Sequence, residues 1–161
     1  MQTKTTDRVY SRADGEGEAC WFVGALLQSK AGGRETDGRF ALLDQTMPPG
    51  YVVPRHIHLN EDEAWYLLEG SMTFYCGDHV IDAAERGFVF APRGVAHTFK
   101  VGARGARALT FAFPSGFGDF VAEMGEPAPE LTIPPPASVD QRRLAEVAHK
   151  YGIEIVGPPP E

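Results

Sequence analysis

Two histidines that stand one residue apart are the first residues of this sequence that could do chemistry together. His56 and His58 lie in the stretch GYVVPRHIHLNEDEAWYLLEG, and an acidic cluster follows them directly. On a β-strand, residues i and i+2 point to the same face, so both imidazoles would project together from positions roughly 7 Å apart. That separation lets the two rings converge on one metal ion. The alternative is a pair of polar side chains on an ordinary strand.

Two further residues could complete a metal site. After the turn LNED the chain would return antiparallel, and Glu63 is the first residue of the returning strand that can face the same interior. A third histidine, His97, follows the sharp turn PRG. Three imidazoles and a carboxylate form a mixed nitrogen and oxygen donor set, which suits one divalent transition metal such as Fe, Mn, Co, Ni, Cu or Zn. The residue types favour a metal site without deciding which metal binds.

The elements that must position these residues are short strands. Each expected strand is rich in bulky apolar or β-branched residues and is bounded by turn residues. The expected strands are 19–28, 39–48, 51–58, 63–69, 71–76, 79–82, 87–91, 96–101 and 106–113. Between two of them, Gly77 and Asp78 fit a two-residue hairpin turn that has glycine first. Many short strands at this spacing are typical of a β-sandwich or barrel, so we predict an all-β fold.

The two ends of the chain differ in character from the strand-rich middle. We expect a flexible lead-in at 1–18, a barrel domain at 19–113 and a C-terminal extension at 114–161. The extension should hold a short helix in GFGDFVAEMGEP and a clear helix near 138–151, where apolar residues recur at helical spacing. Ser138 and Gln141 fit a capping box at its start. We expect this helix to pack on the outside of the sheet.

Composition limits the function classes. The 161 residues suffice for one domain with a real core. The net charge of −7 argues against nucleic acid or an anionic membrane as the main partner, because both select for a basic face. The longest apolar run, CWFVGALL, is too short to cross a membrane, and the first residues have no apolar signal core. We therefore expect a cytoplasmic protein whose partner is a small molecule.

The spacing around the candidate ligands resembles the cupin superfamily. Residues 50–70 have the pattern G-x5-H-x-H-x4-E-x6-G of the first cupin motif, and FVFAPRGVAHTF at 88–99 resembles the second motif, P-x-G-x2-H. The resemblance implies a jelly-roll β-barrel that closes around one metal. It implies as ligands the residues that match the two motifs, namely His56, His58, Glu63 and His97. Arg86 stands where the second motif expects a glycine, and Val101 where an asparagine is often found.

The flanking segments resemble small single-domain cupins related to bacterial quercetin 2,3-dioxygenases. That resemblance implies a metal-dependent dioxygenase that acts on a hydroxylated aromatic or enol substrate, uses O₂ and needs no organic cofactor. Glu63 would then have a second role as the catalytic general base. Two alternatives stay open: a non-oxidative metal-dependent isomerase, decarboxylase or cyclase, and a metal-dependent module that only binds a small ligand. Cupins commonly dimerise through barrel strands, so a homodimer is expected.

Several aromatic residues could line a substrate pocket beside the metal. The candidates are Tyr51, Trp65, Phe74 and Phe99, and the alternative is ordinary barrel core. Glu61 and Asp62 are expected to be turn residues at the barrel mouth rather than ligands. His79 is expected on the surface after a hairpin turn, and His149 on the C-terminal helix away from its apolar stripe.

Overall fold

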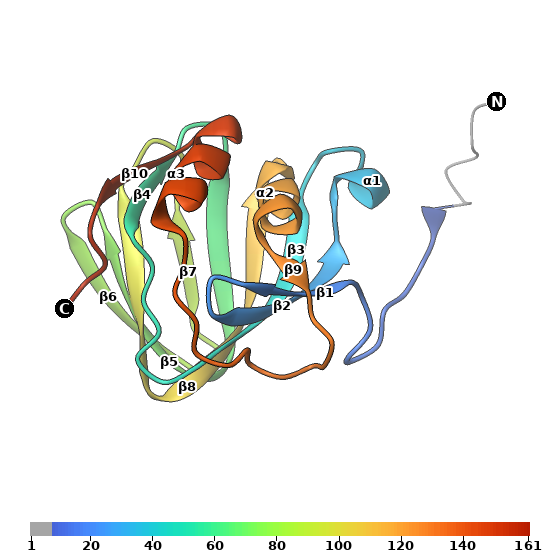
Figure 1. Cartoon of the computed structure of the whole chain (residues 1–161), viewed down its shortest axis with the longest axis horizontal. Coiled ribbons are helices and arrows are strands. Elements are labelled where there is room, and N and C mark those ends of the chain that lie inside the picture. The colour runs from blue at the N-terminus through green and yellow to red at the C-terminus, as the bar shows by residue number, and fades with distance from the viewer. Residues whose placement is uncertain (1–7) are drawn as a thin grey trace.

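A computed structural model describes residues 8–161, which form a curved sheet with helices on one side (Figure 1). Ten strands of the described chain form one sheet. They are β1 (Ala19–Phe22), β2 (Ala25–Ala31), β3 (Ala41–Met47), β4 (Arg55–His58), β5 (Asp62–Cys76), β6 (His79–Ala84), β7 (Phe88–Ala91), β8 (His97–Phe113), β9 (Glu126–Pro127) and β10 (Ile153–Gly157). The helices are α1 (Gly33–Thr36), α2 (Gly116–Met124) and α3 (Gln141–Lys150). The mainly β fold predicted from the sequence is confirmed, while the first residues of the expected 1–18 lead-in, 1–7, lie outside the described residues.

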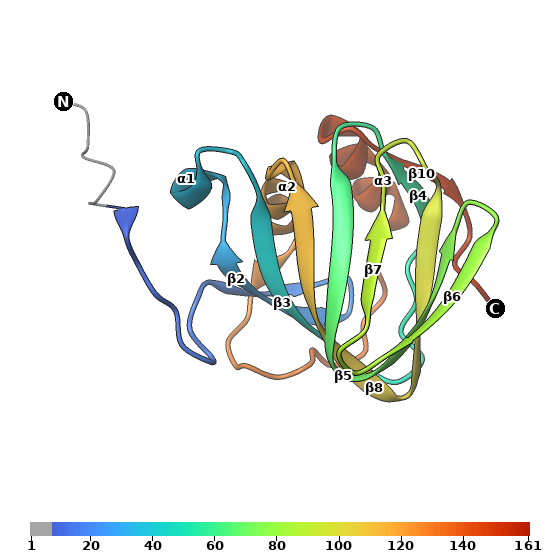
Figure 2. The ribbon, with the colours of Figure 1, turned by 180° about the vertical axis from the view of Figure 1, so that it is seen from behind.

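Two long antiparallel strands, β5 and β8, form the spine of the sheet (Figure 2). The sequence analysis expected each of them as two short strands. The predicted breaks at Gly70 and at 102–105 are wrong, because both strands continue through these positions. The chain instead bends at bulges, with register shifts between Leu67 and Glu69 and between Gly70 and Met72. Gly70 has φ +77°, and a Cβ at this position would lie 2.1 Å from the carbonyl oxygen of Gly105. The close approach requires glycine and keeps the two strands paired through the bend.

The N-terminal part of the sheet also differs from the expectation. The single strand predicted at 19–28 is a hairpin of β1 and β2. Its two-residue turn is Val23–Gly24, with φ values of 48° and 85°. A turn with two positive φ angles matches the twist of paired strands, but valine rarely adopts that conformation, which is why the sequence did not indicate the turn. The loop predicted at 31–38 contains the short helix α1.

The helix α3 lies close to where the sequence predicted it. Its first residue and the face of the sheet that it covers differ from the prediction. Its N-cap is Asp140, whose side chain accepts a hydrogen bond from the backbone nitrogen of Arg143 at 3.0 Å. The capping box expected at Ser138 is therefore wrong. The expectation that the helix packs on the outside of the sheet is wrong as well. Leu144 and Ala148 are buried and line an interior pocket, so α3 covers the inner face together with α2.

The chain after α3 returns to the sheet and flanks the strand of the two histidines. In β10, Ile153 pairs with His58 and Ile155 pairs with His56. On its other side, β4 meets β8, where His56 lies opposite His97. The strand that bears the HxH pair is thus held between two neighbours, one of which comes from the end of the chain. No helix of residues 8–161 is long and apolar enough to span a membrane.

The core lies between the inner face of the sheet and the helices α2 and α3. Trp65, Leu67, Met72 and Phe74 of β5 are almost fully buried. Phe120 and Val121 of α2 are buried in the same cluster. The helices therefore complete the core, and they place their side chains over the face from which the two histidines project.

Candidate metal centre and pocket

Four side chains from three strands converge inside the sheet. One ligand atom of each of His56, His58, Glu63 and His97 lies within 4.8 Å of those of the other three. His56 and His58 belong to β4, Glu63 belongs to β5, and His97 is the first residue of β8. Three of the four are buried and His56 is half-buried. The structure brings together every residue that the sequence proposed as a ligand, at a spacing that could hold one metal ion.

Two backbone carbonyls orient two of the imidazoles. His56 Nδ1 donates to the carbonyl oxygen of Pro54 at 2.7 Å, and His97 Nδ1 donates to that of Val95 at 3.1 Å. A carbonyl oxygen only accepts, so Nδ1 donates, and Nε2 is the atom of each ring that is directed toward the cluster and can bind a metal. On His97 this Nε2 shares a hydrogen bond of 2.8 Å with Glu63 Oε2. The two atoms lie close enough together to bind one metal ion, which would take the place of the shared proton.

His58 gives a second indication of a missing cation. The side chain is 1% exposed, and among residues 8–161 neither ring nitrogen has a hydrogen-bond partner. Its Nε2 lies 3.1 Å from Glu63 Oε2, which is an ion-pair distance but not a hydrogen bond. A buried polar group without a partner is costly and rare. A metal bound to this nitrogen removes that cost, so the residues present fit a divalent transition metal.

The pKa values describe the metal-free cluster. Burial, with the nearby His97 and His58, lowers the pKa of His56 to about 3. Burial also opposes the charged form of His58, but the carboxylates of Glu63 and Glu61 outweigh it and raise its pKa to about 10. Burial would raise the pKa of Glu63, yet His58 and His97 hold it well below its ordinary value. Glu63 is therefore ionised, as a metal ligand must be.

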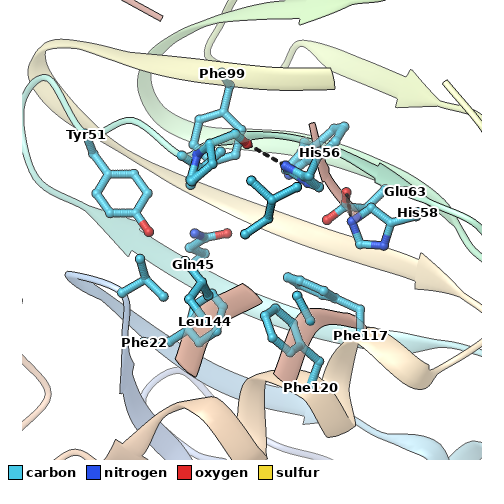
Figure 3. Close-up of a pocket in the computed structure, with 16 residues that line it drawn as sticks. Phe22, Gln45, Tyr51, His56, His58, Glu63, Phe99, Phe117, Phe120 and Leu144 are labelled. Atoms are coloured by element: carbon cyan, nitrogen blue, oxygen red, sulfur yellow. Dashed lines mark hydrogen bonds and ion pairs between the residues drawn. The ribbon is translucent and has the colours of Figure 1, made fainter. Parts of the chain in front are cut away.

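A pocket of about 70 Å³ is lined by three of the four residues, His56, His58 and Glu63 (Figure 3). Of the aromatic residues proposed from the sequence, Tyr51, Trp65 and Phe99 line it. Phe74 does not. It is fully buried and packs against Trp65 with ring centroids 4.9 Å apart, so it supports the wall from behind.

Most of the remaining pocket wall could not be found from the sequence motifs. It comes from segments distant in the chain, and its members are Phe22, Val23, Gln45, Val53, Pro54, Phe117, Phe120, Leu144, Ala148 and Ile155. Their apolar character was visible in the sequence. Their common location depends on α2 and α3 lying over the sheet, which no local pattern indicated.

The acidic residues between the ligands are placed differently from the expectation. Glu61 was predicted to be a turn residue at the mouth, but it is 3% exposed, and its Oε2 accepts from the backbone nitrogen of Phe117 at 2.7 Å. Asp62 lies nearer the surface and pairs with Arg93 at 3.2 Å. His79 and His149 are exposed, as expected.

The fold and this cluster define the class of protein: a mainly β, jelly-roll chain with a candidate metal centre inside the sheet. Residues 43–111 match the family described as Cupin domain. This segment contains both motifs, so the resemblance of residues 43–111 to a cupin domain, which the sequence had indicated, is confirmed.

The chain is distantly similar to several known proteins. The quercetin 2,3-dioxygenase of Bacillus subtilis (strain 168) is 25% identical over 118 residues, which cover 73% of this chain but only 35% of that protein. The match therefore spans about a third of the curated relative. Among solved structures, KdgF from Halomonas sp. has a TM-score of 0.57 at 13% identity, covering 66% of this chain and 94% of that chain. A predicted oxalate decarboxylase from Thermotoga maritima has a TM-score of 0.58 at 15% identity, covering 66% and 99%. These two structures are similar in fold alone.

Proposed function

We propose that the protein is a metal-dependent dioxygenase that acts on a small hydroxylated aromatic or enol substrate. The observation that carries the proposal is a buried set of three histidines and one glutamate beside an apolar pocket. The distant sequence similarity to a quercetin 2,3-dioxygenase supports the same reaction class. When bound to these four residues, the metal would supply Lewis acidity that lowers the pKa of a substrate hydroxyl.

Glu63 has a proposed second role as general base. Its carboxylate borders the pocket and is buried, so it can accept the proton of a substrate hydroxyl placed there. In the metal-free cluster, the charge on His58 holds the pKa of Glu63 low and makes it a weak base. A metal ligand must be deprotonated, so His58 would carry no charge in the loaded protein and the metal would take its place as the cation beside Glu63. Glu63 would act as a base with its carboxylate released from the metal.

The pocket walls would protect a reactive substrate from water. Trp65 and Phe99 come from the sheet, and Phe117 and Phe120 come from α2, so apolar rings face the pocket from two sides. Phe117 also packs against His58, with ring centroids 5.6 Å apart. An apolar enclosure of this kind limits side reactions with solvent.

One observation favours a second candidate function. The pocket of about 70 Å³ is several times the space that one water needs but well below the usual range for drug-sized ligands, so it is small for a flavonoid unless α2 or α3 moves. A small substrate would suit a non-oxidative, metal-dependent isomerase, decarboxylase or cyclase equally well. The two functions differ in whether turnover consumes O₂.

Oxygen consumption tests the proposal. The protein is stripped of metal, reloaded anaerobically with Fe, Mn, Co, Ni or Cu in turn, and then exposed to O₂ with flavonols or small hydroxypyranones. We expect O₂ uptake with one of the metals and its loss in His58→Ala, while the exposed control His79→Ala keeps it. Substrate conversion without O₂ uptake would move the assignment to non-oxidative chemistry. Stoichiometric binding without any product would indicate a binding module.

A further inference from the structure

Besides His58, a second polar group in the pocket has no hydrogen-bond partner within the described chain. The side chain of Tyr51 is buried, with 8% of the residue exposed, and its hydroxyl makes no hydrogen bond within the described chain. Buried hydroxyls in native proteins nearly always have a partner, and an exception calls for an explanation. The hydroxyl points into the pocket, so the missing partner can be supplied from there (Figure 3).

Tyr51 lies at the far end of the pocket from the metal centre. Three ring contacts connect the two ends: Tyr51 to Phe99 at 6.2 Å, Phe99 to Trp65 at 6.3 Å, and Trp65 to His97 at 5.6 Å between centroids. Figure 3 draws Tyr51 on the opposite side from His56, His58 and Glu63. A ligand that reaches both ends must cross an apolar middle section.

A second polar side chain borders the same end of the pocket. Gln45 of β3 is 5% exposed and lines the pocket. Its Oε1 accepts a hydrogen bond from Thr110 Oγ1 at 2.9 Å, which holds the amide in one orientation. The amide nitrogen is then the group that can donate toward the pocket, on the side where Figure 3 places Tyr51.

We propose that Tyr51 and Gln45 form a distal subsite that binds a hydroxyl or carbonyl oxygen of the substrate. The inference rests on the proposed function, in which an enol oxygen occupies the metal end. Together the two ends specify a substrate class: a small planar enol with a second oxygen group on the opposite side of the ring. A ligand that lacks this group leaves the Tyr51 hydroxyl unpaired, and sites with buried polar groups discriminate against such ligands.

A matched pair of ligands tests the subsite. Kojic acid and allomaltol are hydroxypyranones with the same metal-binding enol and ketone, and they differ by one hydroxyl on the opposite side of the ring. Binding is measured by calorimetry on metal-loaded protein without O₂. We expect the wild type to bind kojic acid about 3- to 10-fold more tightly than allomaltol, as one added hydrogen bond predicts. Tyr51→Phe should lose most of this preference, with Gln45 as the one donor left, while the control Tyr66→Phe, on the other face of the sheet, keeps it.

The possible outcomes distinguish a failure of the distal subsite from a failure of the proposed function. If allomaltol binds and kojic acid gains nothing in the wild type, the subsite is wrong while the proposed function stands. A preference that is undiminished in Tyr51→Phe also overturns the subsite. If neither compound binds to the loaded protein, enol recognition at the metal fails, and the subsite fails with it.

Thermal unfolding gives a readout that does not depend on metal or ligand. Because the Tyr51 hydroxyl has no protein partner, Tyr51→Phe should unfold at the same temperature as the wild type or higher. A midpoint several degrees lower would show that the hydroxyl has a structural partner in the free protein, and would overturn the inference.

Discussion

The carboxylate of Glu61 accepts a hydrogen bond at 2.7 Å from the backbone nitrogen of Phe117, in the first turn of α2. The other carboxylate oxygen lies 3.8 Å from Nδ1 of His58. One buried side chain therefore connects the helix that covers the pocket with a histidine of the candidate metal centre. Its charge also suits the N-terminus of a helix, where the backbone amides are unpaired.

Replacement of Glu61 by alanine should weaken both the fold and the metal site. The loss of a buried charged hydrogen bond is expected to lower the free energy of unfolding by about 1.5–3 kcal/mol. The loss of the group beside His58 should lower the metal affinity by about tenfold. Chemical denaturation and metal titration measure the two effects. Glu69→Ala, at an exposed glutamate, is the control. An unchanged metal affinity in Glu61→Ala would show that Glu61 stabilises the position of α2 and does not support the metal site.

Removal of one histidine should remove the metal. In His97→Ala the site keeps two histidines and Glu63, and we expect the metal content after purification and dialysis to fall well below that of the wild type. Plasma mass spectrometry measures the bound metal per chain, with His149→Ala, an exposed histidine of α3, as the control. Full metal content in His97→Ala would show that the ion is held elsewhere.

Glu63 can be tested as a base separately from its role as a ligand. Glu63→Gln keeps the size and one oxygen donor but cannot take a proton. With metal loaded to the wild-type level, we expect substrate turnover to fall by roughly 10²- to 10⁴-fold, the usual contribution of a general base. Rates are compared at equal metal content. Full turnover in this variant would leave Glu63 as a ligand only.

The contribution of this cluster to the stability of the metal-free protein should be largest near pH 6.5. The pKa of His56 is lowered to about 3, so below pH 6.5 the unfolded chain binds a proton that the folded chain refuses, and stability falls with decreasing pH. The pKa of His58 is raised to about 10, so its contribution is fully present below pH 6.5 and is lost as the pH rises toward 10. Glu63, with its lowered pKa, adds to the loss on the acid side.

Unfolding midpoints of chelator-treated protein at several pH values check this prediction. The variant His58→Ala should lose the decline between pH 6.5 and 10, while the control His79→Ala keeps it. The metal-loaded wild type should show a smaller decline as well, because a bound metal requires a deprotonated His58. An alkaline decline that is the same in His58→Ala would assign the effect to other groups.

The size of the pocket should limit which ligands enter. Leu144 of α3 is buried and lines the pocket, so Leu144→Ala is expected to cost about 2–5 kcal/mol of stability and to enlarge the space beside the metal centre. We expect flavonols to bind this variant more tightly than they bind the wild type, as measured by fluorescence titration. Leu131→Ala, at an exposed leucine, is the control. Unchanged flavonol affinity would indicate that α3 already moves aside.

The sequence by itself determined the residues of the candidate metal centre and the mainly β fold. The HxH pair, Glu63 and His97 were all identified in advance, because strand alternation and short turns relate spacing directly to direction. Local physics governs such features, and they need no knowledge of distant contacts. The same rules did not predict the β1–β2 hairpin and gave one continuous strand instead, because the turn begins with a valine at positive φ.

Only the tertiary structure decided what surrounds the centre. The buried position of Glu61, the place of α3 over the inner face, and the pairing of β10 with the HxH strand all join segments that are far apart in the chain. The unpaired hydroxyl of Tyr51 is visible only when every neighbour is known. The physical reason is that burial and hydrogen-bond satisfaction depend on long-range packing, which a local sequence pattern does not contain.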